Sequence, residues 1–165
     1  KNIFTRVLKS HIKVATYKIR NNTSGSQIDK EARQPLNQIK LDYAHGTGHG
    51  VGYFLNVHEG PQAISQNNRI NFKEGMIVSN EPGYYENGKF GIRIENLVRV
   101  KRNKKGYSFD NLTMAPIDKT LVDKNILDKK EINWLNEYHN DVFNNIKKFM
   151  DKSELLSLKE ACSKI

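Results

Sequence analysis

The chain has 165 residues, of which 37% are hydrophobic and 27% are charged, and its formal net charge is +9. This length suits one domain with a buried core, and the composition predicts a soluble protein. No apolar run approaches the ~20 residues that cross a bilayer, and the first residues lack the apolar core of a signal peptide. The single cysteine, Cys162, cannot form an internal disulfide, so we expect a cytoplasmic protein. Because the chain begins with Lys1 instead of Met, we expect it to start inside a longer protein.

The positive charge is spread along the chain, although such a charge can indicate a nucleic-acid or anionic-membrane partner. The one dense cluster, residues 101–105, lies between two strand-like stretches and contains no aromatic residue that could stack on bases. We therefore interpret it as a solvated hairpin loop, and neither a nucleic acid nor a membrane is expected as a partner.

The first 42 residues predict two amphipathic helices. The first spans residues 2–19, where apolar residues recur at spacings of three and four. The second begins after a turn at residues 21–25, with Ser26 as its N-cap and Asp29 three positions later. Pro35 lies inside the apolar stripe of this second helix, so we expect a kink or a restart there.

Residues 43–110 lose the helical period and become rich in glycine, which predicts strands and turns. Residues 76–80 form a short buried-strand candidate. In residues 92–100 apolar side chains alternate with polar ones, so one strand would place Arg93 and Glu95 on the same polar face.

The helical period returns after Pro116. Asp128 and Glu131 have the spacing of a capping box, and a long amphipathic helix follows as far as Phe149. A last short helix opens at Ser153. The order of helices, then sheet, then helices predicts an α+β fold.

Two histidines lie in the glycine-rich stretch His-Gly-Thr-Gly-His-Gly-Val-Gly, which spans residues 45–52, and His58 follows in Val-His-Glu-Gly-Pro. Glycines allow the backbone to approach an ion closely, and neutral imidazole is the commonest nitrogen ligand of metals. His49 is therefore the strongest candidate ligand. His11 and His139 lie on helical stripes without such a frame, so we interpret both as structural.

Glu81 follows a short apolar strand and precedes Pro-Gly, whereas Glu95 lies within the alternating segment. Together with His49 they form an oxygen-rich ligand set, which favours Mn²⁺ and also permits Co²⁺ or Zn²⁺. Two ions would require further carboxylates. The acidic residues before His45 are Asp29, Glu31 and Asp42, and helix capping and solvation explain the first two. The missing ligands are therefore expected upstream of Lys1.

These motifs resemble those of aminopeptidase P (Xaa-Pro aminopeptidase), a member of the pita-bread metallopeptidase group. The resemblance extends along nearly the whole chain, with blocks at residues 44–61, 79–96 and 111–122. It implies the C-terminal half of a pita-bread fold, with helices packed on a curved antiparallel sheet and a helical extension. It also implies a division into residues 1–105 of the catalytic domain and residues 106–165 of the extension.

The resemblance further implies a role for each motif residue. His49, Glu81 and Glu95 would bind two divalent ions, with Glu95 as the bridging ligand and Glu81 also as the general base. His45 and His58 would bind the substrate and stabilise the tetrahedral intermediate, and Arg93 would orient Glu95. The implied partners are peptides with proline at the second position and a second copy of the chain, bound through the C-terminal extension. In the family, two further aspartate ligands come from strands that would precede Lys1. This chain alone, without those aspartates, would be inactive.

Two alternatives remain open at this stage. The pita-bread fold also has non-catalytic members that bind proteins or nucleic acid, although their ligand residues are usually substituted, whereas here His49, Glu81 and Glu95 are present. The other alternative is a stand-alone hydrolase with a single metal ion.

Overall fold

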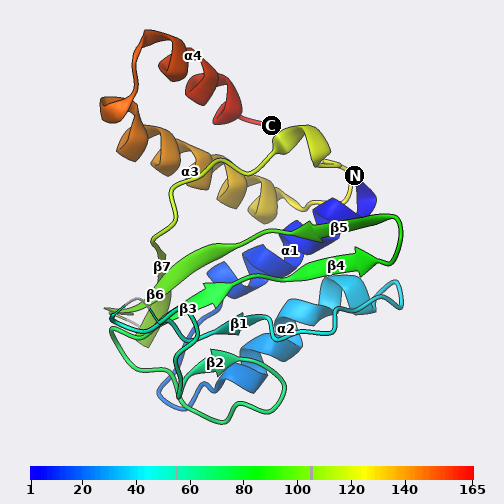
Figure 1. Cartoon of the computed structure of the whole chain (residues 1–165), viewed down its shortest axis with the longest axis vertical. Helices are drawn as coiled ribbons and strands as arrows, with labels where there is room; N and C mark the ends of the chain where they lie inside the picture. The colour runs from blue at the N-terminus through cyan, green and yellow to red at the C-terminus, as the bar shows by residue number, and fades with distance from the viewer. Residues whose placement is uncertain (55, 105) are drawn as a thin grey trace. The chain divides into compact units, whose positions relative to one another are not determined.

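The computed structural model describes residues 1–54, 56–104 and 106–165, and shows the predicted α+β composition (Figure 1). Lys105, the last residue of the predicted basic loop, lies outside the described residues. The helices are α1 (Asn2–Ala15), α2 (Gly25–Asn37), α3 (Lys129–Ile146) and α4 (Lys152–Ala161), with short 3₁₀ helices η1 (Lys119–Leu121) and η2 (Lys147–Phe149). The strands are β1 (Gly48–His49), β2 (Ala63–Ile64), β3 (Ile77–Asn80), β4 (Gly83–Glu86), β5 (Phe90–Arg93), β6 (Asn96–Asn103) and β7 (Gly106–Asn111).

The chain divides into two compact units. Residues Arg6–Thr113 form what we call the sheet unit, and residues Lys1–Thr5 together with Met114–Ile165 form the helical unit. The division falls after β7 because this strand pairs with β6 along its whole length. None of the described helices is long and apolar enough to cross a membrane.

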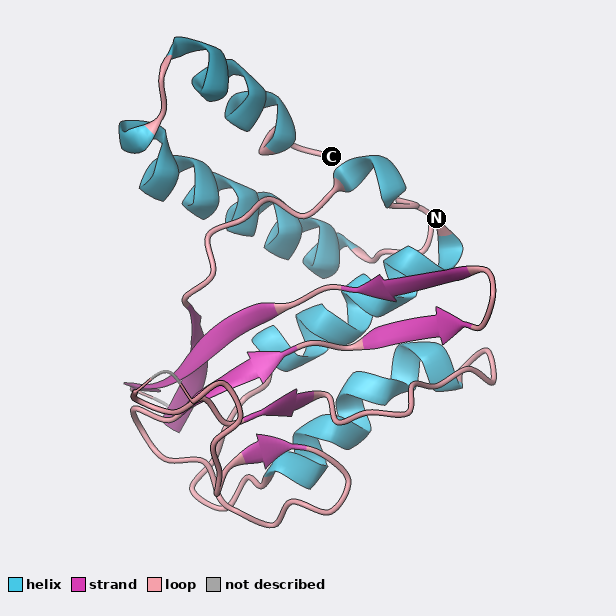
Figure 2. Cartoon of the chain, in the orientation of Figure 1, coloured by secondary structure: helices cyan, strands magenta, loops and turns pink. Residues whose placement is uncertain are grey.

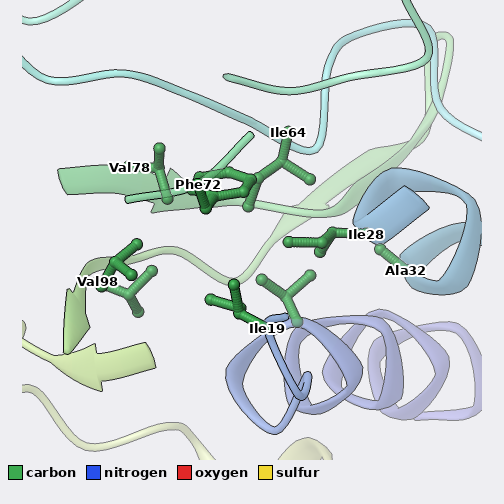
Figure 3. Packing of buried hydrophobic residues seen from close by; sticks show 9 residues of the cluster. Ile19, Ile28, Ala32, Ile64, Phe72, Val78 and Val98 are labelled. Carbon is green, nitrogen blue, oxygen red and sulfur yellow. The ribbon is translucent and has the colours of Figure 1, made fainter. Parts of the chain in front are cut away.

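In the sheet unit, all strand pairs are antiparallel, and α1 and α2 lie on one face of the strands (Figure 2). The strand order is β3-β6-β7 in the largest sheet, and β1-β2 and β4-β5 form two further pairs. The core between helices and strands consists of aliphatic side chains and one phenylalanine (Figure 3): Val14, Ile19, Ile28, Ala32, Ile64, Phe72, Val78, Val98 and Val100. Each large apolar side chain buried here stabilises the fold by about 1.5–3 kcal/mol relative to its exposed state.

The first helix is shorter than predicted, since α1 ends at Ala15 and not at residue 19. Ile19 is instead extended and bridges to Tyr107, with its N–H donating to the Tyr107 carbonyl at 3.2 Å and its carbonyl accepting at 3.0 Å. Its side chain remains only 1% exposed. Periodicity identified Ile19 as buried, but a strand edge satisfies its backbone as well as a helix does.

The start of α2 also differs from the prediction, because the N-cap is Ser24 and not Ser26. Gln27 completes the cap by accepting a hydrogen bond from the Ser24 N–H at 2.8 Å. The predicted restart at Pro35 does not occur, and the helix continues to Asn37. The Pro35 carbonyl accepts a hydrogen bond from Arg6 of α1 at 3.0 Å.

The single strand predicted over residues 92–100 is wrong, because β5 ends at Arg93 and β6 begins at Asn96. The two strands belong to different pairs, β5 with β4 and β6 with β3 and β7. Ile94 and Glu95 form the connection between them. Ile94 remains buried and its N–H donates to the Pro82 carbonyl at 3.4 Å.

In the helical unit, the capping box predicted for α3 is confirmed. Asp128 accepts hydrogen bonds from the N–H groups of Lys130 and Glu131, and the Glu131 carboxylate accepts one from the Asp128 N–H. Asp151 caps α4 in the same way, two residues before the start predicted at Ser153. His139 is fully buried, and its Nε2 accepts a hydrogen bond from the Ile117 N–H at 3.2 Å, in agreement with a structural role.

Candidate metal centre

The candidate site forms where β1 meets the end of β3. Gly50, just after β1, bridges to Val78 of β3, and the Glu81 N–H donates to the Thr47 carbonyl at 2.8 Å. These backbone contacts bring His49 and Glu81, which are separated by a long loop in the sequence, to the same place. His49 Nε2 lies 3.2 Å from Glu81 Oε1.

The close approach of β1 to β3 requires glycine at position 48. A Cβ atom on Gly48 would lie 1.9 Å from the Ser79 carbonyl oxygen, a distance at which the strands would have to separate. The glycine-rich motif therefore has a packing reason: it permits the backbone contact that places His49 beside Glu81.

Ser79 joins the two side chains through its hydroxyl group. Ser79 Oγ accepts a hydrogen bond from the His49 N–H at 2.9 Å and donates one to Glu81 Oε1 at 2.8 Å. Its side chain is fully buried. Sequence analysis did not identify Ser79, although its position two residues before Glu81 on a strand places both side chains on one face.

The hydrogen bonds of His49 define the form of its imidazole ring. Its Nδ1 lies 3.0 Å from the Gly50 carbonyl oxygen, which can only accept, so Nδ1 carries the proton. In the neutral ring Nε2 then presents a lone pair toward the carboxylate oxygen of Glu81. Two lone pairs at 3.2 Å attract each other only through a proton or a cation between them, and one imidazole with one carboxylate suits a divalent metal ion.

Arg93 binds the other oxygen of Glu81, with Nη1 3.3 Å from Oε2. Its Nε donates to the hydroxyl oxygen of Tyr85 at 2.7 Å. The hydrogen bond to Tyr85 is the largest cause that raises the pKa of Arg93, and the nearby carboxylates of Glu81 and Glu95 raise it further. Arg93 therefore remains a cation that holds Glu81, whereas sequence analysis had assigned it to Glu95.

Tyr85 extends this chain of contacts to His45. Because the Tyr85 oxygen accepts from Arg93, its single proton is available for His45 Nε2, which lies 3.0 Å away. His45 Nδ1 is 2.7 Å from the Gly46 carbonyl and donates to it. A hollow of about 390 Å³ opens beside His45, with Tyr43 in its wall. Tyr85 is a second residue of the candidate site that was not predicted from the sequence, although it lies inside the motif around Glu81.

His58 lies directly against His49, with ring centroids 3.8 Å apart and the ring planes tilted by 33°. Glu95 lies on the exposed connection between β5 and β6, where it acts on Arg93 as a nearby negative charge. Within residues 1–54, 56–104 and 106–165, no group of three or more histidine, cysteine and acidic side chains is placed so as to hold a metal ion. The structure places His49 beside Glu81 and His58 against His49, and the bridging role of Glu95 stays a prediction.

A buried ion pair between Asp29 and Arg33 contacts the histidine loop, by which we mean residues 45–49. Asp29 is 1% exposed and accepts hydrogen bonds from Arg33 Nε at 2.8 Å and from Thr47 Oγ1 at 2.7 Å. Thr47 in turn accepts a hydrogen bond from the Tyr43 hydroxyl at 2.5 Å. The interpretation of Asp29 as a capping and solvated residue is therefore wrong, because its carboxylate is buried and anchors the loop that contains His45.

Arg33 completes this support. It also donates to Asp42, to the Tyr43 carbonyl at 2.8 Å and to the His45 carbonyl at 2.7 Å, and its guanidinium lies over the Tyr43 ring. Burial lowers the pKa of Arg33, but the hydrogen bonds to Asp29 and Asp42 and the charges of Tyr43 and Asp29 together outweigh burial, so the net shift of this pKa is upward. Burial also raises the pKa of Tyr43, which therefore remains a hydrogen-bond donor.

Comparison with known proteins places this geometry in a family. Residues 1–102 match metallopeptidase family M24, and residues 105–165 match the C-terminal region of peptidase M24. A probable Xaa-Pro aminopeptidase P of Laccaria bicolor is 49% identical over 176 residues, which cover 99% of this chain and 27% of that protein. The chain thus spans about a quarter of the length of this curated relative.

Solved structures agree with this assignment. The crystal structure of X-prolyl aminopeptidase from Caenorhabditis elegans, described as a cytosolic enzyme with a di-nuclear active site, has a TM-score of 0.92 and 40% identity, and covers 99% of this chain and 28% of that one. Prolidase from Pyrococcus furiosus has a TM-score of 0.57 and 29% identity over 66% of this chain and 31% of its own. These similarities show the predicted C-terminal part of a pita-bread fold. The chain therefore belongs to metallopeptidase family M24, with the C-terminal region of that family at residues 105–165.

Proposed function

We propose that this chain is part of a dinuclear-metal aminopeptidase that removes an N-terminal residue preceding proline. The observation that carries the proposal is the pair His49 Nε2 and Glu81 Oε1, two lone-pair donors 3.2 Å apart. Similarity to Xaa-Pro aminopeptidases along 99% of the chain supports the choice of substrate. Two divalent ions, Mn²⁺ in the first place and Co²⁺ or Zn²⁺ as alternatives, would polarise the scissile carbonyl and activate the attacking water when bound.

The residues of this chain have distinct roles in the proposal. His49, Glu81 and Glu95 would hold the ions, and Glu81 would also act as the general base. Arg93 and Ser79 each hold one oxygen of Glu81, so its carboxylate keeps one orientation while it takes up a proton.

His45 and His58 bind the substrate in this proposal. In the observed hydrogen-bond pattern His45 Nε2 accepts from Tyr85. His45 in this form therefore accepts a hydrogen bond from a substrate N–H that replaces Tyr85, while its Nδ1–H continues to donate to the Gly46 carbonyl. His58 lies against the face of His49, where it closes one side of the site.

We further propose that the remaining carboxylate ligands come from the three quarters of the relatives' length that this chain does not span. The 165 residues alone would then be inactive. Residues 1–105 would be catalytic-domain sequence and residues 106–165 an extension that pairs with a second copy. A cytoplasmic location is proposed from the relative described as cytosolic.

The test compares the complete gene product containing this chain with the isolated 165 residues, using Xaa-Pro peptides and Mn²⁺, Co²⁺ or Zn²⁺. We expect the complete product to release the N-terminal residue and to bind two ions per chain, and the isolated chain to do neither. Glu81→Ala should lower kcat/KM by roughly 10³-fold, the scale at which loss of a group acting in the transition state is felt.

Lys89→Ala is the matched control, because Lys89 follows β4 at an exposed position and, within the described residues, its side chain pairs with Glu86. It should leave kcat/KM unchanged. A complete product that is inactive with all three metals, or equally active with Glu81→Ala, would refute the peptidase proposal. Turnover by the isolated chain would refute only the proposal that it is inactive.

A non-catalytic nucleic-acid-binding module is less well supported by the structure. In the hairpin of β6 and β7, Arg102 pairs with Glu74 at 3.1 Å, and Arg99 pairs with Asp110 at 2.7 Å. Lys101 lies 4.0 Å from Asp110 as well. These carboxylates offset the positive charge that would attract phosphates. A single-metal hydrolase remains distinguishable by the stoichiometry of bound metal.

A further inference from the structure

One buried residue of α1, His11, contacts the residue that precedes each of the two candidate carboxylate ligands. The His11 carbonyl accepts a hydrogen bond from Asn80 Nδ2 at 3.0 Å, and His11 Nδ1 lies 3.2 Å from the Ile94 carbonyl oxygen. Asn80 directly precedes Glu81, and Ile94 directly precedes Glu95. His11 therefore touches the two segments that deliver the two glutamates, although it lies about seventy residues upstream of the first of them in the sequence.

The contact with Ile94 defines the form of the His11 ring. A carbonyl oxygen can only accept, so this hydrogen bond requires the proton on Nδ1. The side chain is fully buried, and this burial lowers the pKa of His11 to about 4, so the ring is neutral at physiological pH. A neutral ring in one tautomer gives a fixed hydrogen bond, which is what a clamp requires.

The sheet supplies the second half of the arrangement. Asn80 and Asn96 are direct partners in the antiparallel pair of β3 and β6, and both are almost fully buried. Glu81 directly follows Asn80 at the end of β3, and Glu95 directly precedes Asn96 at the start of β6. Strand pairing thus fixes the lateral spacing of the two segments, and His11 fixes their position relative to the helix beneath.

We propose that His11 is a positioning residue, which fastens the segments carrying Glu81 and Glu95 to α1 and thereby sets the separation of their carboxylates. This proposal rests on the proposed function in one respect only, namely that the separation of the two carboxylates matters for metal binding. The clamp itself is a property of the chain without metal or substrate, so it can be tested when the peptidase proposal fails.

The test uses amide hydrogen exchange of the 165-residue chain, read residue by residue by NMR without metal. His11→Leu keeps an apolar volume and removes the imidazole donor, whereas in His11→Asn the side-chain amide can take the place of Nδ1–H. We expect His11→Leu to lower protection of the Ile94 amide by roughly 10-fold more than that of the Val100 amide, as a local opening does, whereas the Glu81 amide should change less because residue 11 keeps the backbone carbonyl that binds Asn80. His11→Asn should restore protection at the Ile94 amide.

His139→Leu serves as the matched control, because it also removes a fully buried histidine, but one in the helical unit. It should leave the Glu81 and Ile94 amides unchanged. Equal loss of protection at Val100 in His11→Leu would show a general structural role and overturn the proposal, as would no restoration by His11→Asn.

A second measurement decides the matter if His11→Leu does not fold. The ring nitrogen shifts of the parent chain report which nitrogen of His11 carries the proton. A protonated Nδ1 whose proton is close to Ile94 is expected. A proton on Nε2 alone would overturn the proposal without reference to any variant.

Discussion

The buried ion pair beneath the histidine loop leads to the most specific stability prediction. Asp29→Asn preserves the shape of the side chain and removes its charge. Asp29 is 1% exposed and receives hydrogen bonds from Arg33 and from both the N–H and the hydroxyl of Thr47. Loss of one partner of a buried ion pair destabilises a protein by about 3–5 kcal/mol. Because Arg33 keeps Asp42 as a partner, we expect about 3 kcal/mol.

The assay is urea unfolding of the 165-residue chain followed by circular dichroism. With a denaturant dependence of roughly 2 kcal/mol per molar urea, 3 kcal/mol corresponds to a fall in the midpoint of about 1.5 M. Glu31→Gln is the matched control on the same helix. Glu31 is 42% exposed at its side chain and pairs with Lys13 at 3.5 Å, so its loss should change stability by less than about 0.5 kcal/mol.

The comparison of these two variants tests whether the charge of Asp29 stabilises the fold because it is buried. If Asp29→Asn and Glu31→Gln shift the midpoint equally, the carboxylate of Asp29 does not act as a buried charge. A local effect is also expected. The amide of Thr47 should lose exchange protection in Asp29→Asn, because this N–H lies 3.4 Å from the Asp29 carboxylate.

Three further predictions concern pH, packing and capping. The folded-state pKa of His11, about 4, is below the value of 6.5 in the unfolded chain, so the unfolded chain binds the extra proton between these pH values. Stability should therefore fall by roughly 3 kcal/mol as the pH is lowered from 6.5 to 4, and the urea midpoint of His11→Asn should lack this component. Gly48→Ala should destabilise by about 1–3 kcal/mol because its Cβ would meet the Ser79 carbonyl at 1.9 Å, whereas Gly46→Ala, whose nearest contact is 3.4 Å, should melt like the parent. Asp128→Ala should destabilise the helical unit by about 1 kcal/mol and raise amide exchange in the first turn of α3; unchanged exchange there would contradict the capping assignment.

Helix prediction succeeded where local chemistry and burial agree. The capping box of Asp128 and Glu131 defines the start of α3 because both hydrogen bonds lie within four residues of the chain. The end of α1 was wrong because Ile19 is buried in either conformation, and the partner that makes it extended, Tyr107, is distant in the sequence. Periodicity reports burial, whereas the choice between helix and strand edge depends on contacts that only the fold provides.

The same limit explains the interrupted strand. Residues 92–100 alternate correctly, and Ile94, Val98 and Val100 are all buried. The alternation contains no sign that β5 and β6 pair with different neighbours. As a result, the shared polar face predicted for Arg93 and Glu95 does not follow from one continuous strand.

For the candidate site, sequence motifs identified His45, His49, His58 and Glu81, which the structure gathers around the end of β3. The residues that hold them were missed for different reasons. Tyr85 could have been noticed, since it lies in the motif that begins at Glu81. Asp29 and Arg33 also gave a signal, because their spacing of four residues puts them on one face of α2.

What the sequence could not reveal is the direction of each hydrogen bond, and this direction is what orders the site. Arg93 donates to the Tyr85 oxygen, and the Tyr85 hydroxyl donates to His45. Arg93 also pairs with one oxygen of Glu81, and the other oxygen accepts a hydrogen bond from Ser79. Glu81 thus receives one hydrogen-bond or ion-pair donor on each oxygen. The carboxylate is thus held at both oxygens, with Oε1 3.2 Å from His49 Nε2, and this is the pair of groups on which the proposed metal site depends.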